Sequence, residues 1–125
     1  MKMLNRSAIS VRLKQPFVDW VNGLDNAQEE TVTLAEANQE ATVYLVPELD
    51  GPEDLGALLE ERYLDILENE WLSWEEDSRL WPDNPDRELF DRMIEIEPSF
   101  MAFDLDEQAP LMGLPMDEVL DLEAD

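Results

Sequence analysis

Residues 50–76 carry the sequence DGPEDLGALLEERYLDILENEWLSWEE, and this stretch decides the fold. Apolar side chains recur within it at intervals of three and four residues: Leu55, Leu58, Leu59, Ile66, Leu67, Trp71 and Trp74. That spacing predicts one long amphipathic helix over about residues 53–76, with a single apolar stripe. The acids Glu53 and Asp54 suit its beginning, because negative charge is favoured where the helix dipole is positive.

Two shorter segments have the patterns of β-strands. Residues Ser7–Leu13 alternate between two sets of side chains, one of them apolar, which predicts a half-buried strand. Residues 41–47 (ATVYLVP) are rich in β-branched and aromatic side chains, with apolar residues on both faces, which predicts a strand at the centre of the sheet. Between them, residues 25–39 are polar and acidic with no strong period, and they offer either a short edge strand at Val32 and Leu34 or a loop.

Proline positions help to define two further helices. Pro16 suits the first turn of a helix that ends near Gly23, with apolar residues at helical spacing between them. A second helix is expected over about residues 85–94, beginning at its proline and capped by Asp83 or Asn84.

The order of these elements predicts an α+β fold. A small sheet of three or four strands, covered on one face by the helices at about 53–76 and 85–94, is the simplest packing. A ferredoxin-like arrangement is one version of it. The last strand, over residues 94–105, is expected to be bent or to lie at an edge because Pro98 interrupts it.

The chain length of 125 residues fits one domain. We expect residues 1–104 to form it. Residues 104–125 contain eight acids and no base, so residues 105–125 are predicted to be an acidic, mobile C-terminal tail.

Two residue types that carry much enzyme chemistry, Cys and His, do not occur in the sequence. Thiol nucleophiles, thiolate metal ligands, imidazole bases and disulfides are therefore excluded. The serines lie in no Gly-x-Ser-x-Gly setting, and the four glycines form no phosphate-binding loop. A pair of carboxylates is the remaining enzyme chemistry, and nothing singles out two acids among 32. We expect no enzymatic activity, no catalytic residue and no cofactor.

Charge is the most unusual property of the sequence, with 32 acidic residues against 8 basic ones and a net charge of −24. Such a surface repels phosphate backbones and anionic membranes and attracts basic proteins. A basic protein is therefore the expected partner, without direct nucleic-acid or membrane contact. The sequence has no apolar run long enough to span a membrane and no signal peptide, so we expect a cytoplasmic protein.

Some carboxylates lie close together in the sequence, as at Asp104 and Asp106 or at Glu95 and Glu97. A hard cation needs several oxygens that converge on one point, and no segment has the twelve-residue calcium-loop pattern with its glycine. With so many acids, close pairs arise by chance, and solvated surface charge is the expected outcome. We therefore predict no specific metal site.

Three features are candidates for binding a basic partner. Trp81 lies in a connection between helices, where an exposed aromatic side chain among acids can bind a cation; core packing is its alternative. The long helix carries acids outside its apolar stripe: the binding candidates Glu60, Glu61, Asp65 and Glu68, with Glu53 and Glu75 in the same row. The tail offers Asp117, Glu118, Leu120 and Asp121, with a disordered solubilising extension as the alternative.

Strand, turn and aromatic motifs occur at residues 14–20 (KQPFVDW), at 42–48 (TVYLVPE), and at 80–82 (LWP) followed by Phe90. In these motifs the chain resembles a group of small uncharacterised bacterial proteins, over residues 5 to about 105. The resemblance implies a bacterial cytoplasmic protein and transfers no activity and no functional residue.

Three classes of function stay open. The first is a non-catalytic interaction or regulatory module whose acidic face binds a basic partner. The second is a duplex-nucleic-acid mimic that blocks a nucleic-acid-binding protein with regular rows of carboxylates. The third is a small divalent-cation-binding protein or cation-dependent enzyme. If the acid excess is an adaptation to a salty cytoplasm, the charge gives no information about partners. A stability that rises strongly with added salt indicates such an adaptation. The first class accounts for the charge, the missing catalytic residues and the tail together, and is our prediction.

Overall fold

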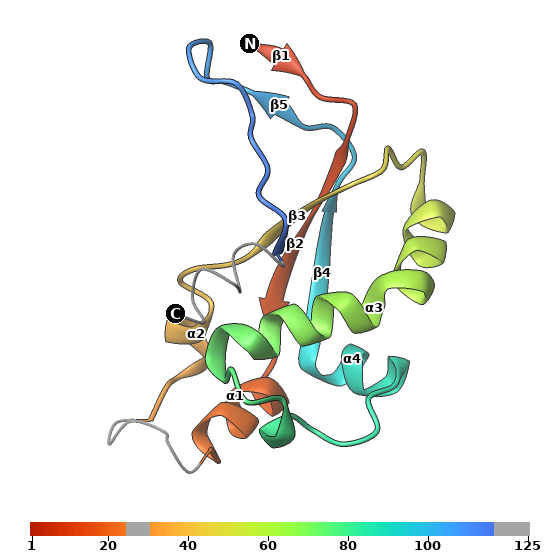
Figure 1. Ribbon diagram of the computed structural model, residues 1–125. Helices are drawn as coiled ribbons and strands as arrows, with labels where there is room; N and C mark the ends of the chain where they lie inside the picture. Colours follow the sequence, from red (N-terminus) through yellow and green to blue (C-terminus); the bar gives the residue numbers. More distant parts are fainter. Residues whose placement is uncertain (25–30, 117–125) are drawn as a thin grey trace.

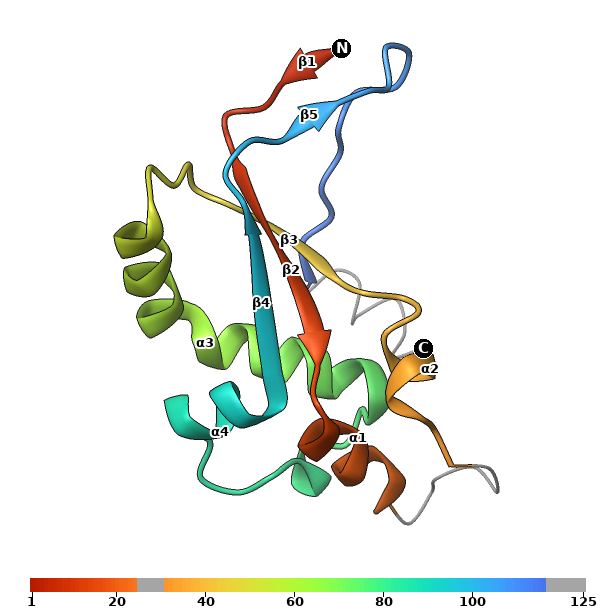
Figure 2. The same ribbon diagram turned by 180° about the vertical axis from the view of Figure 1, so that it is seen from behind.

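The computed structural model describes residues 1–24 and 31–116, and the fold is α+β as the sequence predicts (Figures 1 and 2). The elements in chain order are β1 (Lys2–Met3), β2 (Ser7–Leu13), α1 (Gln15–Asn22), α2 (Leu34–Ala37), β3 (Val43–Val46), α3 (Pro52–Trp74), a 3₁₀ turn (Ser78–Leu80), α4 (Arg87–Met93), β4 (Ile94–Ser99) and β5 (Phe103–Asp104). The periodic segments therefore fold as predicted, with α3 and β2 close to their expected bounds.

The main sheet has three antiparallel strands in the order β3-β2-β4. The predicted central position of β3 is wrong, because β2 lies in the middle and β3 at an edge. Val43 and Leu45 on the outer face of β3 are 58% and 51% exposed. The apolar residues on the outer face of β3 therefore form an exposed apolar surface, and no second layer packs on them in the described part of the chain.

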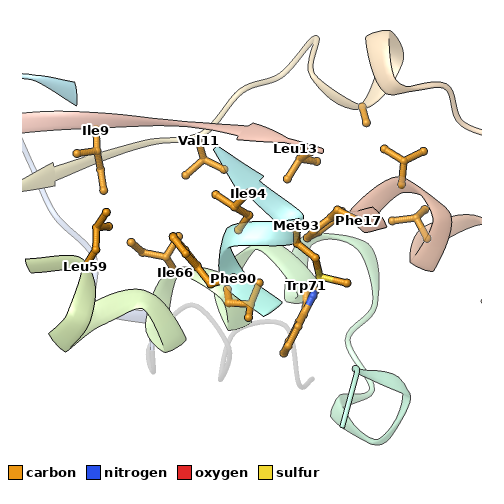
Figure 3. Packing of buried hydrophobic residues seen from close by; sticks show 14 of the residues in the cluster. Ile9, Val11, Leu13, Phe17, Leu59, Ile66, Trp71, Phe90, Met93 and Ile94 are labelled. Carbon is orange, nitrogen blue, oxygen red and sulfur yellow. The ribbon is translucent and has the colours of Figure 1, made fainter. Parts of the chain in front are cut away.

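Helices cover one face of the sheet, and the core lies between the two layers (Figure 3). The alternation of β2 directs Ile9, Val11 and Leu13 into this core, where all three are buried. The stripe of α3 meets them, and Trp71 is among the largest fully buried side chains. Each large apolar side chain buried in this way stabilises the fold by about 1.5–3 kcal/mol. The core therefore fixes α3 across the sheet.

Helix α2 lies within the segment where the sequence offered an edge strand or a loop. The edge strand is not formed, residues 31–33 are a loop, and the helix at Leu34–Ala37 was not predicted. Thr33 and Glu36 form a capping box, in which each side chain accepts a hydrogen bond from the backbone N–H of the other. This reciprocal pairing satisfies two N–H groups that a helix start leaves unbonded, and it begins a helix of only four residues. Asn38 then pairs with both backbone groups of Leu13 on β2, at 2.8 and 3.0 Å.

The predicted cap of α4 is also corrected. Asp86 is the capping residue, and its carboxylate accepts from the backbone N–H of Leu89 at 2.8 Å. Asp83 and Asn84 lie earlier, in a turn where Asn84 has a positive φ of 52°. The chain uses its oxygen-rich residues there to turn, and the helix begins at Arg87, two residues after the predicted start.

The last strand bends as predicted and divides into two pieces. β4, which contains Pro98, pairs with β2 at an edge of the main sheet. β5 leaves that sheet and pairs with β1 in a separate two-stranded sheet. In the described part of the chain, the ferredoxin-like version with four strands in one sheet is therefore not adopted.

Candidate functional site

The outer face of α3 is the most acidic surface of a single element. Its exposed or half-exposed carboxylates are Glu53, Asp54, Glu60, Glu61, Asp65 and Glu68. They share this face because the opposite side of the helix carries the buried apolar stripe. The structure therefore brings together all four candidate acids that the sequence named on this helix.

Leu64 lies at the centre of these acids and is 37% exposed. Residues three and four positions apart are neighbours on a helix surface, so Glu60, Glu61 and Glu68 surround it. An apolar side chain ringed by three carboxylates is the arrangement of a small contact point with a charged rim.

Two of the acids on this face form ion pairs within the chain. Glu60 Oε1 lies 2.7 Å from Arg87 Nη1, and Asp65 Oδ2 lies 2.7 Å from Arg62 Nε. Both carboxylates are largely exposed, and exposed pairs of this kind contribute about 0.2–1 kcal/mol. A cationic partner can therefore compete for either carboxylate at little cost.

Glu75 does not belong to this face, although its sequence spacing placed it in the row. It caps the C-terminal end of α3 and is buried. The helix ends there at Trp74, so the helical spacing that aligned Glu75 with the other acids no longer applies.

Trp81 packs in an aromatic cluster. Its ring centroid lies 5.8 Å from that of Trp71, and the ring centroid of Trp20 lies 6.1 Å from that of Trp71. The indole N–H of Trp81 donates to the backbone oxygen of Glu75 at 2.8 Å. Trp81 is half-buried with its polar atom already bonded, which favours a packing role over a contact with a partner.

The tail candidates Asp117, Glu118, Leu120 and Asp121 lie outside the described residues. The described chain ends at Met116, which lines a hollow of about 510 Å³ between β3 and α3. Arg62, Asp65 and Asn69 line the same hollow from the helix.

Glu70 is a residue that the sequence reasoning missed. It is only 4% exposed, and it lies on the buried side of α3 facing β3. Its carboxylate accepts hydrogen bonds from the hydroxyls of Tyr44 at 2.5 Å and Thr42 at 3.2 Å, and Asn69 donates to Tyr44 at 2.9 Å. The signal was present, since a glutamate four residues from both Ile66 and Trp74 falls inside the apolar stripe.

Burial changes the acidity of this cluster. It raises the pKa of Glu70 above its usual value, and the hydrogen bonds from Tyr44 and Thr42 offset part of that rise. The pKa of Tyr44 is also raised, first by its own burial and then by its bond to Glu70. Glu70 and Thr42 line a second hollow, of about 550 Å³, together with Glu36, Glu40 and Trp74. The cluster joins α3 to the edge strand β3. It also gives this hollow a hydrogen-bond acceptor, and no basic side chain is among the described residues that line the hollow.

No group of three or more acidic side chains within residues 1–24 and 31–116 is arranged to hold a metal ion. The same part of the chain has no helix with the length and apolar character needed to cross a bilayer.

Comparison with known protein families found no matching model, and comparison with curated proteins and with solved structures found no significant match. The resemblance to small bacterial proteins therefore stays a prediction. Any function proposed for the chain rests on its own residues.

Proposed function

We propose that this protein is a non-catalytic interaction module that binds a basic protein through the outer face of α3. One observation carries the proposal: Leu64 is exposed at the centre of Glu60, Glu61 and Glu68. The carboxylates attract and orient a basic partner, while the apolar side chain offers surface that loses water on contact. The net charge of −24 adds long-range attraction that speeds the encounter and weakens as salt is added.

An apolar centre among the acids favours a protein-binding module over a duplex-nucleic-acid mimic, because a row of phosphates presents no apolar side chain. From Glu53 to Glu68 the six outer carboxylates cover about 23 Å of helix, at 1.5 Å per residue. That is roughly one charge per 4 Å, close to the one per 3.4 Å of a single DNA strand. The row differs from a strand of phosphates in two ways, because Arg62 places a positive charge beside Asp65 and Leu64 is exposed among the acids.

Capture of partners from a nuclease-treated bacterial lysate, at low and at high salt, tests the proposal when paired variants are compared. E61Q/E68Q and L64S alter the proposed surface. D83N/E95Q is the matched control for the double variant, because it removes two exposed carboxylates elsewhere and gives the same net charge. We expect the unaltered chain to retain a basic protein at low salt and to release it at high salt. E61Q/E68Q and L64S should no longer bind this protein, and D83N/E95Q should still bind it.

The purified partner then allows a quantitative check by titration calorimetry. Equal weakening by E61Q/E68Q and D83N/E95Q would mean that net charge alone drives binding, and the proposed surface would be wrong. Competition by duplex DNA for the same partner would instead support the mimic. Binding that survives L64S unchanged removes Leu64 as the centre of the contact.

A further inference from the structure

β1 and β5 form a ribbon of two strands that extends away from the helical layer in both views (Figures 1 and 2). Lys2 lies opposite Asp104, and Met3 lies opposite Phe103. A hydrogen bond of 2.8 Å from the backbone N–H of Leu4 to the oxygen of Ala102 continues the ladder toward the main sheet. The ribbon is therefore a regular antiparallel pair that no third strand joins in the described residues.

The two faces of this ribbon differ in character, because neighbouring residues of a strand point to opposite sides. Lys2 and Asp104 share one face, and Met3 and Phe103 share the other. The same alternation adds Met1 and Leu105 to the side of Met3. These four apolar residues are strongly exposed, with Met1 at 69%, Met3 at 67%, Phe103 at 49% and Leu105 at 78%. We call this side, made of Met1, Met3, Phe103 and Leu105, the apolar face of the ribbon.

An exposed apolar face of this kind is expected to pack against another surface. A two-stranded ribbon is at best marginally stable in water unless its apolar side is covered. Monomeric soluble proteins rarely expose large contiguous apolar patches, and such patches mark interaction sites.

Charge on and around the ribbon points to the chemistry of what covers it. The N-terminal amine, Lys2 and Arg6 give three positive charges, and Asp104, Asp106 and Glu107 give three negative ones. The amine and Glu107 form an ion pair at 2.8 Å. On a protein of net charge −24, this balanced region does not select a strongly charged partner, and it adds no local repulsion to the contact between two copies of the chain.

The distribution of these charges is also self-complementary. Asp106 and Glu107 follow β5 at the free end of the ribbon, and Arg6 lies at the other end, where β1 leads into β2. Among the described residues, no carboxylate forms an ion pair with Arg6. Two ribbons packed antiparallel would place each Arg6 near the acidic end of the other, as a two-fold axis requires.

We propose that the apolar face of the ribbon packs against the same face of a second copy, so that the protein is a two-fold symmetric dimer. The contact uses residues separate from the outer face of α3 and leaves that surface available. Its salt response also differs from that of the proposed function. Added salt screens the repulsion between two chains of charge −24 and strengthens the dimer, whereas it weakens the attraction to a basic protein.

Sedimentation velocity of the full chain over a range of concentrations, at low and high salt, tests the dimer. We expect a dimer whose dissociation constant rises at least about tenfold in M3S/F103S, as for loss of a central apolar contact. V43S/L45S is the matched control, because it removes two similarly exposed apolar residues from the outer face of β3. We expect it to leave the dissociation constant unchanged, and thermal melting checks that both variants stay folded.

Charge exchange gives a second test that does not depend on the apolar variants. R6E should weaken the dimer, and R6E combined with D106R should restore it, since the two positions face each other across the proposed axis. A chain that stays monomeric at every concentration overturns the proposal. So does a dimer that is lost in V43S/L45S and kept in M3S/F103S. Failure of D106R to restore R6E overturns the antiparallel arrangement.

Discussion

Glu70 is the residue at which packing and ionisation are most closely coupled. Its carboxyl lies between α3 and β3 with hydrogen bonds from Tyr44 and Thr42, and burial raises its pKa. The unfolded chain exposes this carboxyl to water and returns its pKa to the usual value of 4.5. The folded protein therefore binds this proton more tightly than the unfolded chain does, and stability depends on it.

The sign of that dependence follows directly. The contribution of Glu70 to stability is complete below pH 4.5 and is lost as the pH rises through the higher folded pKa. The uncharged variant E70Q cannot lose it in this way. We expect urea unfolding to show E70Q gaining stability relative to the unaltered protein as the pH is raised from about 4 to 8. A difference between the two proteins that stays constant over this range would contradict a raised pKa.

Trp81 offers a test of packing against binding. Removal of a half-buried indole from the aromatic cluster around Trp71 should lower the free energy of unfolding, and we expect W81A to cost about 2–3 kcal/mol. W81F keeps an aromatic ring and loses the hydrogen bond to Glu75, so it should cost about 1 kcal/mol. Both are measured by urea unfolding. Unchanged stability in W81A, combined with lost partner binding, would assign Trp81 to the partner surface instead.

At the scale of elements, α2 shows how a four-residue helix is held to the sheet. Asn38 follows it and bonds both the N–H and the oxygen of Leu13, as a neighbouring strand would. N38A leaves both groups without these bonds, and we expect a loss of about 2 kcal/mol in urea unfolding. N38D keeps the acceptor and removes the donor, so its loss should be smaller. Equal stability of N38A and the unaltered chain would show that water replaces the side chain fully.

Elements with a sustained period were predictable from the sequence, and others were not. The stripe of α3 repeats over more than five turns, and the apolar face of β2 repeats over its whole length. α2 has no room for a period, and only the Thr33–Glu36 capping pattern marks it. The position of β3 at an edge depends on which strands pair with its two sides, which its own residues do not determine.

The candidate site divides in the same way. The outer acids of α3 could be placed from helical spacing alone, because exposure follows from the position of the apolar stripe. Glu70 could be recognised as out of place in that stripe, but its partners Tyr44, on β3, and Thr42, just before it, lie more than 25 residues away. Glu75 departs from the expected row because the helix ends one residue before it.

For the whole molecule, the net charge of −24 opposes folding, since the compact state brings like charges closer together. Salt screens this repulsion over about 10 Å at 0.1 M. It also weakens the exposed ion pairs, such as Arg62 with Asp65, but each of these contributes little. We therefore expect the melting temperature to rise between low and high salt, and a fall would show that ion pairs dominate.

The location of the repulsion separates a functional acid cluster from a uniform acidic surface. Glu61 and Glu68 lie four and three residues from Asp65, where like charges on a helix repel each other. E61Q/E68Q should therefore raise the low-salt melting temperature more than D83N/E95Q, although both variants have the same net charge. High salt should remove the difference. Equal effects at low salt would mean that the repulsion is spread over the surface, as expected for salt adaptation. A larger effect on α3 would mean that the chain keeps, on one exposed face, a cluster that lowers its own stability, which is the pattern of a surface retained for binding.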